Sequence, residues 1–172
     1  MTDAPKRRER RPVPNEAKLD RAKARAAARL AAVQALYQME LGGQGSDQVI
    51  AEFVEDRLGM DIDGEVLHEA DVTLFKDLVN GVIARQVDID RAIDAFLAPD
   101  WPLARLEAIL RALLRPAAYE LLARSDIPAR VVLNEYVDLA TAFFGEAETV
   151  FANGVLNKLA RQHRLSEFEP AA

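Results

Sequence analysis

No stretch of this 172-residue chain alternates apolar and polar residues over the length of a β-strand. Apolar residues recur instead at the three- and four-residue spacing of helices, alanine and leucine are abundant, and glycine and proline are modest. This pattern favours an all-α fold class of about seven helices, in a chain long enough to bury a core. The expected helices cover residues 18–41, 47–58, 69–86, 89–97, 103–124, 129–144 and 146–162.

Proline and glycine divide these helices into groups. Gly42, Gly43 and Gly45 are expected to end the first helix, and the segment 99–102, Pro-Asp-Trp-Pro, breaks the chain near its middle. We therefore predict two small helical subdomains, residues 18–98 and 99–165, between a disordered basic arm, residues 1–17, and a loose tail, residues 166–172.

Local signals give further expectations. Asp88 is suited to cap the fourth helix, and Pro116 should kink the fifth because it cannot donate its backbone hydrogen bond. Periodicity assigns to the core one face of the first helix and three positions of the third: Ala26, Leu30, Val33, Tyr37 and Leu41, with Leu74, Leu78 and Ile83.

The charge of the chain is split between its ends. Residues 1–30 hold ten Lys or Arg against four Asp or Glu, whereas the whole chain has a net charge of −6. A basic arm on an acidic body is typical of proteins that bind polyanions at one end. Four of the cations recur at helical spacing and should form one stripe, on the side of the first helix away from its apolar face: Lys18, Arg21, Arg25 and Arg29.

A solvated helix face is the simplest interpretation of such a stripe. Like charges one turn apart repel one another, however, and phosphate groups would relieve this repulsion, so we favour nucleic acid over solvent alone. A membrane surface is the competing ligand, but it would need the apolar face that the core uses. Tyr37 and Phe151 are either core residues or rim residues that stack on unpaired bases.

The chain lacks the residues that several classes of metal, phosphate-binding and catalytic site require. The chain has no cysteine, its two histidines, His68 and His163, have no partner at metal spacing, and no glycine-rich phosphate loop or Gly-x-Ser-x-Gly elbow occurs. We expect no enzyme activity, no cofactor and no metal. No secretory signal or membrane span is expected either, which favours a cytoplasmic protein.

Four motifs in register resemble the NusB family of bacterial transcription antitermination factors. They lie at residues 33–38 (VQALYQ), 114–121 (LR, then YEL), 127–140 (IP, LNE and LA) and 151–158 (FANGVLNK). The resemblance covers about residues 20–162. It implies a NusB-like fold of two helical subdomains and RNA binding without catalysis.

The resemblance also implies partners and site residues. NusB proteins pair with NusE, a small-subunit ribosomal protein, bind single-stranded boxA RNA of nascent ribosomal RNA, and join RNA polymerase and other Nus factors to suppress premature termination. The family's basic contacts fall on Arg21, Arg25 and Arg29, and its aromatic contacts on Tyr37 and Phe151. Relatives occur as monomers and dimers, so a homodimer remains open.

The sequence departs from the family at three places. Pro116 stands where an aliphatic residue is usual, Val150 replaces an expected basic residue, and Ala26 and Ala27 interrupt the arginine cluster. Two other functions stay open: an accessory RNA-binding module, related to the NusB-like domain of RNA cytosine methyltransferases, and a scaffold that binds protein alone.

Overall fold

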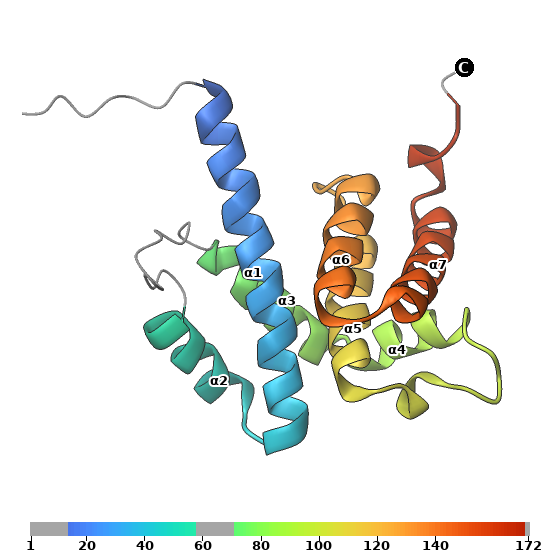
Figure 1. Ribbon diagram of the computed structural model, residues 1–172, viewed down its shortest axis with the longest axis horizontal. Helices are drawn as coiled ribbons and strands as arrows, with labels where there is room; N and C mark the ends of the chain where they lie inside the picture. The colour runs from blue at the N-terminus through green and yellow to red at the C-terminus, as the bar shows by residue number, and fades with distance from the viewer. Residues whose placement is uncertain (1–13, 58–70, 171–172) are drawn as a thin grey trace, which may run out of the picture.

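The structure is a computed structural model that describes residues 14–57 and 71–170. Within these ranges it contains only helices, which confirms the all-α prediction (Figure 1). The α-helices are α1 (Pro14–Gly42), α2 (Ser46–Glu52), α3 (Val72–Ala84), α4 (Gln86–Asp94), α5 (Ala108–Ala123), α6 (Ala129–Phe143) and α7 (Glu146–His163). Three short helical turns accompany them: η1 (Phe53–Arg57), η2 (Leu103–Arg105) and η3 (Leu165–Glu167).

Helix α5 is the centre of the molecule. It contacts α1, α3, α4, α6 and α7, and ten of its residues are buried. Pro116 is one of them, and the helix runs unbroken through it. Because α5 touches helices from both halves of the chain, the buried side chains form one cluster across them. The predicted division into two subdomains between residues 98 and 99 is not marked by separate cores, and it stays a prediction.

Helix α1 packs on α3 and α5 through alanines rather than through large side chains. Val33 is buried and Ala26 and Tyr37 are half-buried, as expected, but Leu30 and Leu41 are 37% and 64% exposed, so the predicted face is wrong for them. The buried positions centre on the small residues Ala28, Ala31, Ala32 and Ala35. Helices can approach closely where the side chains between them are short, and this close approach turns the leucines outward.

Tertiary context corrects two further expectations. Ile83 is 39% exposed, whereas its neighbour Val82 is buried with Leu74 and Leu78. Asp88 lies inside the first turn of α4 and caps nothing, because that helix begins at Gln86. A side chain that does cap its own helix is Asp71, at the start of α3, whose Oδ1 accepts from the backbone N–H of Leu74 at 2.9 Å.

The two ends of the described chain are more ordered than predicted. Helix α1 begins at Pro14, a residue suited to a first helical turn, so residues 14–17 are helical; the rest of the predicted arm lies outside the described residues. At the other end, η3 places Glu167 so that its Oε1 accepts from the N–H of Ala129, at 2.9 Å. The loose-tail prediction is therefore wrong for residues 166–168, because tertiary contacts fix them.

Arg164 stabilises the same end of the molecule. Its guanidinium donates to four backbone carbonyls at distances of 2.6 to 3.0 Å: those of Glu120, Leu121, Arg124 and Ile127. These carbonyls belong to the end of α5 and the turn that follows, where a helix leaves its last acceptors unpaired. Arg164 thus joins the end of α7 to the α5–α6 turn.

None of the described helices combines the length and hydropathy that a bilayer crossing requires.

Candidate functional site

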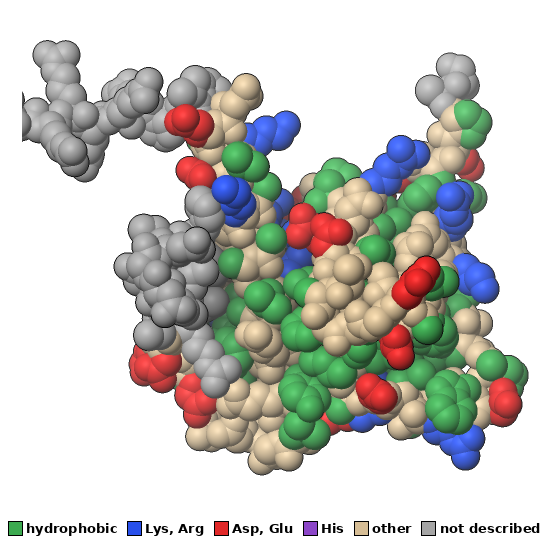
Figure 2. All heavy atoms as spheres, in the orientation of Figure 1, with side chains coloured by type: hydrophobic (Ala, Val, Ile, Leu, Met, Phe, Trp, Pro, Cys, Tyr) green, Lys and Arg blue, Asp and Glu red, His purple; other side chains and the backbone are tan. Residues whose placement is uncertain are grey.

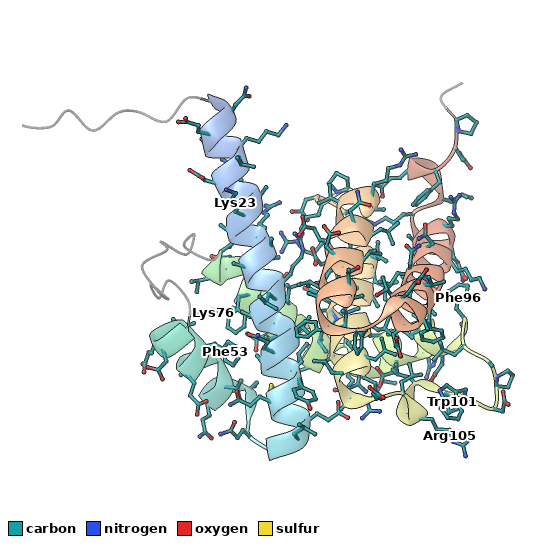
Figure 3. All side chains as sticks on the ribbon, in the orientation of Figure 1. Lys23, Phe53, Lys76, Phe96, Trp101 and Arg105 are labelled. Atoms are coloured by element: carbon teal, nitrogen blue, oxygen red, sulfur yellow. The ribbon has the colours of Figure 1, made fainter. Side chains whose placement is uncertain are left out.

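The outer part of α1 projects past the helices on which the rest of it packs (Figure 1). Lys18, Arg21 and Lys23 are exposed there, and within the described residues none of them has a carboxylate within ion-pair distance. The sequence interpretation missed Lys23, which lies off the predicted stripe but points into solvent as Figure 3 shows. We call these three residues, with Arg25, the basic segment.

Arg25 lies where the basic segment meets the body of the protein. Its side chain is 34% exposed, and its Nε lies 3.8 Å from Oδ2 of Asp71. The backbone N–H of Asp71 donates to the carbonyl of Ala24 at 3.0 Å, which ties the start of α3 to α1. The Nε of Arg25 is buried and has no hydrogen-bond partner. This guanidinium is therefore partly exposed beside Asp71, with its buried Nε unpaired.

Arg29 is buried, although it continues the same spacing along α1. It is 1% exposed and forms a bidentate ion pair with Glu120 of α5, with Nε to Oε2 at 2.9 Å and Nη2 to Oε1 at 2.8 Å. The prediction that Arg29 belongs to an exposed stripe is wrong. The physical reason is that α1 rests on α5 at this level, so the stripe turns inward where the packing begins.

Two residues of α6 complete this buried centre. Oε2 of Glu135 lies 4.0 Å from Nη1 of Arg29, and Tyr136 is fully buried. Burial, followed by the nearby Glu120 carboxylate, raises the pKa of Tyr136 well above its ordinary value. Burial alone would lower the pKa of Arg29, but the hydrogen bonds and charge of Glu120 outweigh it and raise that pKa. Arg29 thus remains charged, and its buried ion pair with Glu120 joins α1 to α5.

A groove lies beside the other half of α1. Its volume is about 440 Å³, and side chains from α1, α5 and α6 line it: Gln34, Tyr37, Gln38, Ile109 and Phe143. Tyr37 is half-buried and packs against the core. The amide of Gln38 donates to Gln44 at 2.7 Å and to Glu52 at 3.0 Å, whereas Gln34 is exposed. Aromatic and amide side chains in one groove offer stacking and hydrogen bonding to a flat polar ring.

Phe151 does not line this groove. It is 37% exposed on α7, next to Val150, which is 64% exposed. The structure therefore joins Lys18, Arg21 and Arg25 in one surface and places Tyr37 in a groove farther along the same helix. Arg29 is buried and therefore outside this surface, and Phe151 is exposed on α7 and does not line the groove.

The side chains of these surfaces include cations, amides and aromatic rings. No group of His, Cys, Asp or Glu that could hold a metal occurs in the described parts of the chain. Exposed cations can bind phosphates, and an aromatic groove can bind bases.

Comparison with known proteins gives this arrangement a family. The NusB family model matches residues 26–161. A transcription antitermination protein NusB from Rhodopseudomonas palustris (strain HaA2) is 50% identical over 169 residues, which cover 98% of each chain.

Solved structures agree with the sequence match. NusB from T. maritima superposes with a TM-score of 0.69 at 28% identity, covering 84% of this chain and 96% of that one. A crystal structure of the antitermination factors NusB and NusE in complex with dsRNA gives a TM-score of 0.66 at 28% identity, covering 81% and 97%. The chain belongs to the NusB family.

Proposed function

We propose that this protein is a transcription antitermination factor that binds boxA RNA of nascent ribosomal RNA together with NusE. The carrying observation is the basic segment, in which three exposed cations have no carboxylate partner among the described residues. Unpaired cations on a projecting helix gain most from phosphate groups, because binding releases the counterions of the nucleic acid. The names of the relatives and the solved complex of NusB, NusE and dsRNA support this function.

The residues divide into three roles under this proposal. The basic segment, with Lys18, Arg21, Lys23 and Arg25, contacts phosphates. Tyr37 stacks on an unpaired base at the edge of its groove. Phe151 offers a second aromatic surface on α7 and is 37% exposed, which leaves part of its ring open to a base. Arg29 acts through α1, since its guanidinium is buried and paired with Glu120, and it orients the basic segment without touching RNA.

The acidic remainder of the chain suits basic protein partners. Residues 31–172 carry twelve Lys or Arg against twenty-four Asp or Glu, and ribosomal proteins such as NusE are typically basic. Complementary charge speeds association and disfavours wrong partners. Through NusE and the other Nus factors, the complex would join RNA polymerase and suppress premature termination.

The test is binding of a short boxA RNA and a scrambled RNA, with and without NusE, to the parent and to Arg21→Ala and Arg25→Ala. Arg91→Ala, an exposed cation on α4, is the matched control. The proposal predicts preference for boxA, enhancement by NusE, and a loss of affinity in the two α1 variants only. Equal binding to both RNAs would leave an accessory RNA-binding module, and no binding would leave a protein scaffold; either result rejects the proposal.

A further inference from the structure

Three more exposed cations lie together at the other end of the chain. Lys158 and Arg161 are one turn apart on α7, and Arg130 lies in the first turn of α6. No ion pair joins any of them to a carboxylate of the described residues. Figure 2 shows Lys and Arg side chains over the end of α7 and the adjoining end of α6. We call these three residues the second basic surface.

Backbone contacts hold this surface together. The N–H of Ala129, next to Arg130, donates to Glu167, and Nη1 of Arg164 donates to the carbonyl of Ile127 at 3.0 Å. The end of α7 is therefore fixed against the start of α6. The guanidinium of Arg161 lies 4.8 Å from the ring centroid of Phe168, a cation–π contact that orders its side chain. An ordered side chain loses less entropy when it binds a ligand.

The nearby acids do not neutralise these cations. Glu167 is engaged by the N–H of Ala129 and by Arg164, and these contacts, in that order, lower its pKa. Glu169 is exposed and forms no ion pair with the three cations.

Other arginines of this region have structural partners. Arg124 is paired with Asp77 and Asp126, and Arg164 is saturated by carbonyls and Glu167. Arg130, Lys158 and Arg161 have no such partners, and like charges on α7 repel one another. The phosphate groups of an RNA strand would relieve this repulsion, because they would neutralise the three positive charges.

We propose that Arg130, Lys158 and Arg161 form a second phosphate-binding surface for RNA that extends beyond the segment held by α1. The inference rests on the proposed function. Both basic surfaces lie at the end of the molecule where α1 begins and α7 ends (Figure 1), so one RNA strand can reach both. The contacts are to phosphates, since the three side chains offer positive charge, and they add affinity without sequence preference.

The test compares two RNAs that share boxA, one limited to that element and one extended on both sides. The triple variant R130Q/K158Q/R161Q is measured against K76Q/R85Q/R91Q, three exposed cations elsewhere that have no ion pair among the described residues. Three lost phosphate contacts flatten the log–log salt slope for single-stranded RNA by about 2, or about 20-fold less change in affinity between 50 and 200 mM salt. We expect this effect for the extended RNA with R130Q/K158Q/R161Q alone.

Three results of the RNA titrations would overturn the inference. They are an unchanged slope for the extended RNA, an equal change in K76Q/R85Q/R91Q, and an equal change for the short RNA. Binding to anionic vesicles that is lost in R130Q/K158Q/R161Q, with RNA binding retained, would assign the surface to a membrane and also reject it. The variant K18Q/R21Q, which must weaken both RNAs, reports on the proposed function separately.

Discussion

Removing the charge of Glu120 tests whether a buried ion pair holds α1 on the body of the protein. The change Glu120→Gln keeps the shape of the side chain and leaves the guanidinium of Arg29 without its counter-charge. Both side chains are at most 2% exposed, so solvent does not screen the pair. Loss of one partner from a buried pair costs about 3–5 kcal/mol of the free energy of unfolding.

The geometry places this variant at the lower end of that range. The Gln amide oxygen can still accept one hydrogen bond from Arg29, and Glu135, 4.0 Å from Nη1 and 30% exposed, partly compensates the charge. We therefore expect a loss of about 3 kcal/mol. The double variant Arg29→Met, Glu120→Met removes both charges and fills the space with apolar atoms, so it should recover to within about 1 kcal/mol of the parent.

The assay is urea unfolding followed by far-UV circular dichroism. The matched control is Glu107→Gln, the same change at an exposed position at the start of α5, which should alter stability by less than about 0.5 kcal/mol. A loss below about 1 kcal/mol in Glu120→Gln would refute the reasoning. So would a double variant no more stable than the single one, because the cost would then not come from an unpaired buried charge.

Three further predictions concern α3, α5 and the turn after it. Gly81→Ala should cost about 1–3 kcal/mol in urea unfolding, because its Cβ would overlap the ring of Tyr119; a loss below about 0.5 kcal/mol would contradict this. Hydrogen bonds from Arg124 lower the pKa of Asp126 to about 2, so the stability it adds is present above its unfolded pKa near 4 and is lost as the pH falls toward 2. The free energies of unfolding of the parent and Asp126→Asn should therefore differ by at most about 1 kcal/mol at neutral pH and become equal in acid. A difference that does not change with pH would contradict the lowered pKa of Asp126. Pro116→Ala should change stability by less than about 1 kcal/mol or raise it, since alanine restores a backbone donor, and a loss above about 2 kcal/mol would show that the proline is required.

The helices were predictable because apolar periodicity and glycine or proline breaks mark them locally. Gly43 illustrates this, since it has a φ of 66° just after α1 ends, as a glycine there can adopt without strain. The buried face of α1 was not predictable in the same way. A helix that packs on two neighbours through alanines leaves Leu30 and Leu41 outside, and periodicity alone gives the larger residues more weight.

The candidate site could be predicted in part from the sequence. The spacing of Lys18, Arg21 and Arg25 identified a basic segment. The same spacing also predicted an exposed Arg29, which is buried in the structure. A signal for this was available, because Glu120 is a single acid within an apolar run of α5 and a buried acid needs a cationic partner. The order of residues 165–168 depends on Arg164 and Glu167 meeting carbonyls and an N–H far away in sequence, which no local pattern contains.

The measurement that tests the central claim most directly is the salt dependence of boxA RNA binding to the variant Lys18→Gln, Arg21→Gln, Lys23→Gln. If the outer part of α1 binds phosphates, three lost contacts should flatten the log–log slope by about 2 relative to the parent, and the control Lys76→Gln, Arg85→Gln, Arg91→Gln should not change it. A slope equal to that of the parent would contradict the account, because the exposed cations of α1 would then be a solvated helix face.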